Sequence, residues 1–391
     1  MKTHVALPVN QRLSQARRRS LMLALAGGAA LASLSARAQP APGKGDILIG
    51  RSTALSGGMA PFLAPIHEGQ DAAVEDANAK GGIGGRKIRL VTLDDGFDPR
   101  RTLENARQLS EKEGVLALLG VSGTSQVMAL LPYLVQAKLP LISVYTGSPA
   151  IRAQQHPYLF TTRASYADEL VKIVRNLVAV QTSRIAVAYE NNDFGKLLLP
   201  LVEKTIAAEG ATLAGSHAIA PTGADANDAA KALAAQKPQA VLLVAAGPPV
   251  VAYVRANRAH LGVPVYTLSL GAGSAVLKAL GDDARGLAVA RTGPSPTKPT
   301  IALTRDFQAS MKRHDKPVDY DRYTGYMDAR VLIEGLRAAG PGVTRASLVQ
   351  AMEGLGNLDL GGYSYQFSPQ NHHGSNYVDI AVVGSGGVYR Q

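Results

Sequence analysis

Short runs of apolar and β-branched residues alternate along most of the chain with longer stretches in which apolar residues recur at helical spacing. The short runs are expected to form strands, at 47–50, 87–94, 115–119, 139–144, 184–189, 212–219, 240–245, 263–269 and 287–291. The stretches between them are expected to form helices, one opened by Pro65, one after Asp98-Pro99, and others over 125–137, 166–180, 195–209, 224–235, 249–260 and 274–280. Strands that alternate with helices form parallel sheets with helices on both faces. The pattern therefore predicts an α/β protein.

The alternation restarts after Thr162 and changes after Arg291. Each of the two runs is long enough for a doubly wound parallel sheet, so two such lobes are expected. The segment after Arg291 holds a proline-rich stretch at 294–299, three expected helices at 300–313, 321–339 and 344–353, and two expected strands at 363–367 and 377–383. Too little chain remains there for a third domain. We therefore expect this segment to return and complete both sheets.

The first 38 residues carry basic side chains but no Asp or Glu. An apolar stretch over 21–34 follows the basic start, and Ala36 and Ala38 place small residues at the two positions that a signal peptidase reads. We expect residues 1–38 to be a signal peptide and Gln39 to begin the mature chain. The pair Arg18-Arg19 leaves a twin-arginine route and the general export route both open.

The formal net charge of the 391-residue chain is +11, from 41 Lys and Arg against 30 Asp and Glu. Six of the basic residues lie in the expected signal peptide, so the rest of the chain carries only +5, and we expect no nucleic-acid partner. The absence of Cys excludes disulfides, thiolate metal ligands, Cys nucleophiles and a lipid-bearing Cys at the cleavage site. The mature protein is therefore expected to be soluble and unlipidated.

Two glycine-rich segments differ from nucleotide-binding loops. The segment 81–85 lies between an expected helix and an expected strand, the reverse of the order in a dinucleotide fingerprint. The segment 120–125 follows a strand and opens a helix, but it lacks the Lys of a phosphate loop and the third Gly of the Rossmann spacing. Its hydroxyl and N–H groups suit a carboxylate at a helix N-terminus. Plain N-capping by Thr124 or Ser125 is the equally open alternative.

Enzyme and metal motifs are scarce in this sequence. It has no Gly-x-Ser-x-Gly elbow and no His-Glu-x-x-His. His372 and His373 are expected in a solvated turn. Asp94 and Asp95 could bind a cation, but an exposed loop before a helix cap at Asp98 is the commoner outcome. We expect no catalytic residue, no metal site and no cofactor.

Tyrosine dominates the aromatic residues, with 14 Tyr against 6 Phe and no Trp. Tyr145, Tyr166 and Tyr189 fall where expected strands run into loops or where helices begin. Ligands of doubly wound sheets bind at the carboxyl ends of the strands, where Tyr offers an apolar wall and a hydroxyl donor. Tyr326 lies at helical spacing on an apolar face and is expected in the core.

Several short motifs follow one another in order: 53–57 (Thr-Ala-Leu-Ser-Gly), 68–73 (Glu-Gly-Gln-Asp-Ala-Ala), 83–88 (Ile-Gly-Gly-Arg-Lys-Ile), Asp94-Asp95 with Asp98-Pro99, and 140–143 (Pro-Leu-Ile-Ser). Their joint order resembles type I periplasmic binding proteins, most of all the branched-chain amino acid (leucine-binding protein-like) class that serves ATP-binding-cassette (ABC) importers. The similarity covers about 45–388. It implies two α/β lobes that are joined by three crossovers and close on a ligand. We expect 39–162 plus 292–358 in the N-terminal lobe and 163–291 plus 359–391 in the C-terminal lobe.

The resemblance also implies which residues contact the ligand. The loop that receives a carboxylate in this family corresponds to Ser122, Gly123 and Thr124, and the loop that completes this grip corresponds to Tyr145, Thr146 and Gly147. The two aromatic contacts correspond to Phe62 and Phe194, and Tyr166 is expected at the mouth of the cleft.

One position departs from the family pattern. Amino-acid-binding members place an acid after the strand that corresponds to 265–268, where it holds the ammonium group, and the matching residue here is Ser269. A buried ammonium without a countercharge costs several kcal/mol, so a ligand that has a carboxylate but no ammonium is favoured. Glu190, Asp193 or Asp321 could supply the charge instead, which keeps an amino acid open.

These features predict a monomeric periplasmic substrate-binding protein, with no enzymatic activity, for an ABC importer. It is expected to capture a small carboxylate-bearing solute, either an amino acid or an aromatic or aliphatic carboxylic acid, and to deliver it to a membrane permease. A ligand sensor that docks on a receptor ectodomain and an α/β enzyme with a nucleotide cofactor are the alternatives.

Overall fold

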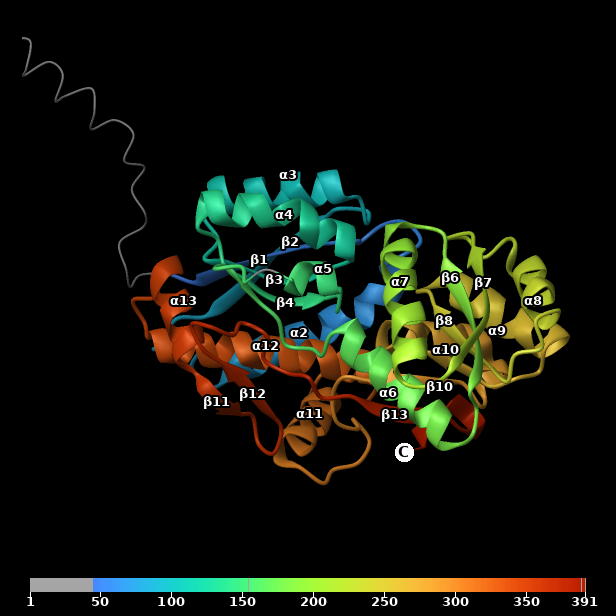
Figure 1. Cartoon of the computed structure of the whole chain (residues 1–391). Coiled ribbons are helices and arrows are strands. Elements are labelled where there is room, and N and C mark those ends of the chain that lie inside the picture. The colour runs from blue at the N-terminus through green and yellow to red at the C-terminus, as the bar shows by residue number, and fades with distance from the viewer. Residues whose placement is uncertain (1–44, 154, 388, 391) are drawn as a thin grey trace, which may run out of the picture. The chain divides into compact units, whose positions relative to one another are not determined.

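The computed structural model describes residues 45–391 with the exception of 154, 388 and 391 (Figure 1). The expected signal peptide, residues 1–38, lies outside the described residues. The described chain forms two α/β lobes, each with its own sheet. This architecture confirms the predicted fold class of two doubly wound lobes.

The first lobe contains a five-stranded parallel sheet in the order β2-β1-β3-β4-β5, with β1 (Ile47–Thr53), β2 (Ile88–Asp94), β3 (Ala117–Ser122), β4 (Leu141–Tyr145) and β5 (Leu159–Phe160). Its helices are α2 (Ala60–Ala79), α3 (Pro99–Glu111), α4 (Thr124–Ala137), α5 (Pro149–Arg152), α11 (Ala302–Arg313), α12 (Tyr320–Ala339) and α13 (Arg345–Gly354). Neighbouring strand residues face opposite sides, so Leu118 packs with α3 and α4 while Leu119 packs with α2 and α12. These two pairs of helices cover opposite faces of the sheet (Figure 1). Burial on both faces explains the uninterrupted apolar runs.

The second lobe contains a seven-stranded sheet in the order β14-β13-β10-β9-β8-β6-β7, with β6 (Arg184–Glu190), β7 (Thr212–Ile219), β8 (Ala240–Val244), β9 (Val265–Thr267), β10 (Ala288–Arg291), β13 (Asp379–Val383) and β14 (Tyr389–Arg390). Its helices are α6 (Tyr166–Ala179), α7 (Asp193–Ala208), α8 (Ala226–Ala234), α9 (Pro248–His260), α10 (Ser274–Leu280) and the 3-10 helices η3 (Ser269–Ala272), η4 (Gly281–Ala284) and η5 (Ser385–Gly387). One face packs against α6 and α7 and the other against α8, α9 and α10. Strands β13 and β14 pair antiparallel at one edge.

The chain passes between the lobes three times, at 161–165, at 292–301 and at 368–378. The last passage comes later than the expected boundary after residue 358, because the hairpin of β11 (Gly356–Asp359) and β12 (Ser364–Phe367) packs with the first lobe. Along β12, the buried Tyr365 and Phe367 alternate with exposed residues. Their rings pack in the core that contains Leu119. The chain therefore enters the second sheet only at β13.

A proline lies in the first turn of each of the first two helices, α2 and α3, but in α2 it is not the proline that was expected. Helix α3 begins as predicted, with Asp98 accepting a 2.8 Å hydrogen bond from the backbone N–H of Arg100 and Pro99 in the first turn. Helix α2 begins at Ala60, earlier than the expected start at Pro65, which lies inside the helix. Pro61 occupies the first turn instead, where a missing N–H costs no hydrogen bond.

Two polar residues that were expected in solvent are buried. His372 is 2% exposed, its ring stacks on that of Phe160, and its Nε2 lies 3.2 Å from the Glu353 carboxylate. Asp95 is also 2% exposed and accepts hydrogen bonds from the hydroxyls of Ser52 and Thr102. Both expectations were wrong because each residue has a partner from a segment distant in sequence, Phe160 for His372 and Ser52 for Asp95. Tyr326 is buried in the core, as predicted.

None of the helices in the described part of the chain is long and apolar enough to cross a bilayer. Among the same residues, no group of three or more His, Asp or Glu side chains is arranged to hold a metal ion.

Candidate ligand-binding cavity

A cavity of about 350 Å³ lies between the lobes, where strands of both sheets end. Ser122 ends β3, Tyr145 ends β4 and Glu190 ends β6. The first lobe lines it with Met59, Phe62, Leu63, Phe97, Pro99, Ser122, Gly123, Thr124, Ser125, Gln126, Tyr145 and Asp321. The second lobe lines it with Tyr166, Glu190, Asn192, Asp193, Phe194, Ala246, Gly247, Leu270, Gly273, Ala275 and Val276. This is the place where doubly wound sheets bind small molecules.

The N-terminus of α4 opens into this cavity without a side-chain cap. Capping by Thr124 or Ser125 was one of the two open alternatives, but the hydroxyl of Thr124 lies 2.9 Å from that of Thr146, and the hydroxyl of Ser125 donates to Asp193 at 3.3 Å. Plain N-capping by either residue is therefore wrong. The first N–H groups of a helix have no intrahelical partner and carry partial positive charge. This end of α4 is thus suited to an anion.

Gly123 shapes the approach to these N–H groups. Its φ of 97° lies in the left-handed region that favours glycine. A Cβ at this position would also lie 2.1 Å from Oε1 of Gln126 and 3.0 Å from the ring of Phe97. The amide of Gln126 donates in turn to the backbone oxygen of Phe97 at 2.7 Å. A side chain at position 123 would therefore disturb both the helix start and the cavity wall.

Aromatic rings from both lobes form much of the remaining wall: Phe62, Phe97, Tyr145, Tyr166 and Phe194. The rings of Tyr166 and Phe194 meet edge to face with 5.5 Å between their centroids, a favourable geometry for aromatic pairs. The aliphatic side chains of Leu63, Leu270 and Val276 add to this surface. A ligand that fills the cavity therefore needs an apolar body.

Three carboxyl groups line the same cavity. Asp321 accepts hydrogen bonds from the backbone N–H and hydroxyl of Ser274, at 2.6 and 3.0 Å. Asp193 is exposed. Glu190 is 7% exposed, and its Oε2 accepts one hydrogen bond of 3.2 Å from the N–H of Ala246. Burial raises the pKa of Glu190 to about 7.

The structure brings seven of the ten expected ligand contacts to the cavity wall: Phe62, Ser122, Gly123, Thr124, Tyr145, Tyr166 and Phe194. Thr146 and Gly147 lie directly behind it. Thr146 contacts Thr124 through its hydroxyl, and the backbone oxygen of Gly147 accepts the N–H of Tyr166 at 2.8 Å. These two residues support cavity-lining residues and do not line the cavity themselves.

Ser269 does not line the cavity, and its neighbour Leu270 does. The chain was expected to run as a strand to residue 269, but β9 ends at Thr267 and Ser269 begins the 3-10 helix η3. Successive residues of a 3-10 helix point about 120° apart, so a one-residue difference in phase decides which side chain faces the ligand. The cavity therefore has an apolar residue where the resemblance had suggested a Ser.

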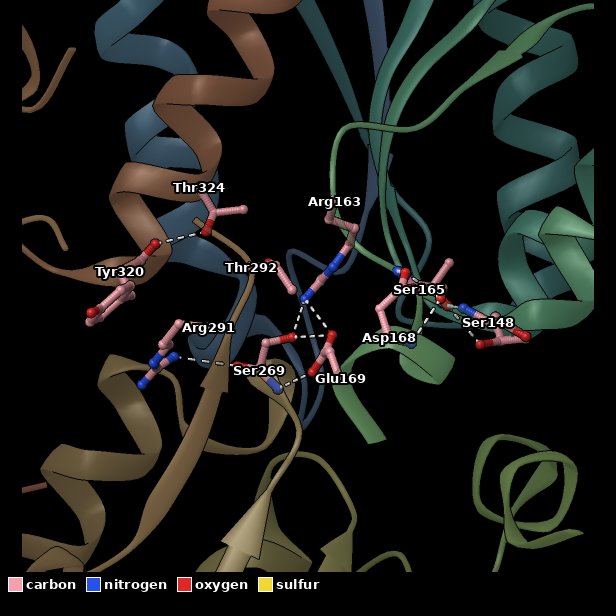
Figure 2. Close-up of polar contacts among 12 residues, drawn as sticks. Ser148, Arg163, Ser165, Asp168, Glu169, Ser269, Arg291, Thr292, Tyr320 and Thr324 are labelled. Atoms are coloured by element: carbon pink, nitrogen blue, oxygen red, sulfur yellow. Dashed lines mark hydrogen bonds and ion pairs between the residues drawn. The ribbon is translucent and has the colours of Figure 1, made fainter. Parts of the chain in front are cut away.

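Ser269 instead belongs to the Arg163 cluster, defined as Arg163, Glu169 and Ser269 (Figure 2). The carboxylate of Glu169 accepts the N–H and the hydroxyl of Ser269 at 2.7 and 2.8 Å. The guanidinium of Arg163 donates to the Ser269 hydroxyl and lies 3.8 Å from the Glu169 carboxylate. Burial opposes the charge on Arg163, but the surrounding groups, with Glu169 first among them, together outweigh burial and raise the pKa of Arg163.

The Arg163 cluster contacts the cavity through Tyr145. The guanidinium carbon of Arg163 lies 4.6 Å from the centre of the Tyr145 ring, within cation–π range. Arg163 stands on the first passage between the lobes, while Glu169 and Ser269 belong to the second lobe. One wall of the cavity is thus held by an ion pair at the junction of the lobes.

Sequence reasoning missed Phe97 and Leu270 as cavity residues. Phe97 follows the acids of 94–95, has a φ of 64°, and reaches the cavity through a turn in which the N–H of Phe97 donates to Asp95 at 2.9 Å. No apolar periodicity marks a single ring in such a turn.

The chain matches known proteins over most of its length. The sequence profile of the periplasmic binding protein family covers residues 46–387. The Leu/Ile/Val-binding protein of Escherichia coli (strain K12) is 24% identical over 159 residues, 40% of this chain and 43% of that protein. The aligned part of the chain thus spans less than half the length of this curated relative.

Two solved structures illustrate the similarity in three dimensions. A substrate-binding periplasmic protein from Ralstonia solanacearum is 30% identical, with a TM-score of 0.81 over 88% of this chain and 99% of that one. An ABC-transporter solute binding protein from R. palustris in complex with benzoate is 21% identical, with a TM-score of 0.78 over 88% and 95%. At that identity the second likeness shows the fold alone. The chain belongs to the periplasmic binding protein family, type I, of the Leu/Ile/Val-binding class.

Proposed function

We propose that this periplasmic binding protein is the substrate-binding component of an ABC importer. It binds a small carboxylate-bearing solute between its lobes and delivers it to a membrane permease, as a soluble monomer, without chemical change to the solute. Export to the periplasm by the segment 1–38 is part of the proposal. Support comes from membership of the family and from a cavity at the junction of two lobes.

The main support for a carboxylate on the solute is the uncapped N-terminus of α4. It brings backbone N–H groups and the side chains of Ser122 and Thr124 to the wall of a cavity that is lined largely by aromatic and aliphatic residues. A carboxylate at this end would accept charge-assisted hydrogen bonds from the free N–H groups. The aromatic rings would cover the apolar body of the same molecule.

An aromatic or aliphatic carboxylic acid without an ammonium group fits this cavity better than an α-amino acid. Leu270 occupies the wall where the family pattern would put an acid, and Ser269 faces away. An ammonium would then depend on Glu190, Asp193 or Asp321. The R. palustris neighbour holds benzoate, which supports the first class, whereas the name of the E. coli relative supports branched-chain amino acids.

The test is titration calorimetry of the mature protein with matched pairs: 3-phenylpropionate against phenylalanine, and 4-methylpentanoate against leucine. We expect the acid of each pair to bind at least ~10-fold more tightly, because no cationic group has to be buried. Tighter binding of both amino acids would overturn the assignment to acids without ammonium. Absence of binding by all four molecules would overturn the carboxylate site.

The matching variant is Thr124→Val, which keeps the shape of the side chain and removes its hydroxyl. Thr92→Val is the control, because Thr92 lies on β2, its hydroxyl accepts a hydrogen bond from Arg51 on β1, and it does not line the cavity. We expect only Thr124→Val to weaken the binding of the acids.

A further inference from the structure

Glu190 differs from the other buried carboxyl groups of the described chain. It ends β6, lies on the second-lobe wall of the cavity and is 7% exposed. Its one hydrogen bond in the structure is the 3.2 Å contact from the N–H of Ala246 to Oε2. No Lys, Arg or His within the described residues forms an ion pair with it. Its second oxygen, Oε1, is therefore an acceptor without a protein donor.

Each of the other buried acids accepts at least one hydrogen bond that is shorter than the one to Glu190. Glu169 is held by Ser269 and Arg163. Asp321 receives two hydrogen bonds from Ser274, and Asp328 receives one from the hydroxyl of Thr162. A carboxyl group that is buried without such partners disfavours its own ionised form. The raised pKa of Glu190 reflects this environment.

On the second-lobe wall of the cavity, Glu190 is the buried side chain that offers a free hydrogen-bond acceptor to a ligand. The side chain of Asn192 caps α7 by accepting the N–H of Gly195 at 3.0 Å, and Asp193 is exposed and accepts from Ser125 across the lobes. The neighbouring lining residues Phe194 and Leu270 are apolar. A molecule bound by its carboxylate to α4 of the first lobe presents its other groups to this wall.

We propose that Glu190 determines specificity by accepting a hydrogen bond from a hydroxyl group of the solute, so that the preferred ligand is an aromatic carboxylic acid that also carries a hydroxyl. This inference rests on the proposed function, in which α4 binds the carboxylate. A hydroxyl has one O–H to donate and matches the one free oxygen of Glu190, whereas an ammonium has three N–H donors. The aromatic wall selects the ring.

The experiment compares benzoate, 3-hydroxybenzoate, 4-hydroxybenzoate and 4-aminomethylbenzoate by titration calorimetry at pH 7 on the mature protein. The wild type is expected to bind one hydroxybenzoate at least ~10-fold more tightly than benzoate. Glu190→Leu is expected to remove this preference, with a loss of ~10-fold or more for that hydroxybenzoate and a change of less than ~3-fold for benzoate. Asp228→Leu, which removes an exposed acid on α8 of the same lobe, is expected to change neither.

Glu190→Gln provides a second variant that keeps an oxygen for Ala246 but has no charge. It is expected to lie between the wild type and Glu190→Leu in its preference for the hydroxyl. The melting temperature of both unliganded variants is expected to equal or exceed that of the wild type, since each removes a buried carboxyl without a cation. A purely structural role would lower it.

Three outcomes overturn the proposal in distinguishable ways. If Glu190→Leu weakens benzoate and the hydroxybenzoates equally, Glu190 does not read the hydroxyl although acids do bind. If 4-aminomethylbenzoate binds best and loses most in Glu190→Leu, the group that Glu190 recognises is an ammonium. If none of the four molecules binds the wild type, the proposed carboxylate site fails and the role of Glu190 falls with it.

Discussion

Two buried carboxyl groups of the second lobe, Glu169 and Glu190, have opposite surroundings. Glu169 is fully buried, yet two groups of Ser269 donate to it and Arg163 lies 3.8 Å away. Glu190 is almost as buried, but it has one weak backbone donor and borders an open cavity. A partnered acid holds the structure together, whereas an acid with a free oxygen at a cavity wall is available to a ligand.

The largest difference between the two acids should appear in stability. Glu169→Ala leaves the buried guanidinium of Arg163 without its carboxylate, which is expected to cost about 3–5 kcal/mol of unfolding free energy. Glu190→Ala should cost much less. Urea unfolding of the two variants, followed by circular dichroism, measures both values. Equal losses would remove the distinction between them.

The pH dependence of stability should separate Glu190 from the rest of the protein. Its pKa is about 7 in the folded state against 4.5 for an unperturbed Glu, so the folded state binds the proton more tightly. The stability from this group is therefore fully present below about pH 4.5 and lost as the pH rises through about 7, on the order of 3 kcal/mol in all.

The measurement is the difference in unfolding free energy between wild type and Glu190→Gln at several pH values from about 5 to 8. Groups common to both proteins cancel in this difference. The free energy of unfolding of Glu190→Gln should increase relative to that of the wild type as the pH rises. A difference that stays constant over this range would contradict a raised pKa for Glu190.

Adding a single methyl group at the N-terminus of α4 should lower both stability and ligand affinity. Gly123→Ala places a Cβ 2.1 Å from the Gln126 oxygen at a φ of 97°, and we expect a loss of about 1–3 kcal/mol in stability together with at least ~10-fold weaker binding of carboxylic acids. Gly81→Ala is the control, since its φ is 95° but nothing lies within 4 Å of the added Cβ. It should lose stability from backbone strain alone and keep its affinity.

The smallest expected effect concerns the residue behind the cavity wall. Thr146→Val removes the 2.9 Å hydrogen bond to Thr124 and the acceptor of the Ser148 N–H. We expect a loss of about 0.5–1.5 kcal/mol in stability and a few-fold weaker binding by calorimetry. An unchanged affinity would show that Thr124 keeps its position without this support. The Arg163 cluster should be unaffected, because Thr146 does not contact it.

Local signals predicted the order of most elements, and the family resemblance added seven of the residues that line the cavity. The alternation of apolar runs with helical stretches matches the strands β1–β4 and β6–β10 within a few residues, whereas the short α5 and β5 were not predicted. Strand ends of a doubly wound sheet meet by topology, so Ser122 and Tyr145 could be assigned to the cavity before any distance was known.

Other features depended on contacts that a local pattern does not contain. The exchange of Ser269 for Leu270 at the cavity follows from the short 3-10 helix η3, whose phase is set by the packing of Ser269 against Glu169, a hundred positions away. His372 is buried because Phe160 and Glu353 come to it from the first lobe. The hairpin β11–β12 joins the first lobe because its rings fill that core.

The sequence by itself determined the α/β class, the two-lobe organisation and the family, because periodicity, turn residues and short motifs act over a few neighbouring positions. Only the tertiary structure decided which buried acid has partners. Along the chain, Glu169 and Glu190 each have a polar residue on one side and an apolar or aromatic residue on the other. Their burial and their hydrogen bonds are set by residues far away in sequence. That difference is what turns one of them into a structural ion pair and the other into the proposed specificity residue.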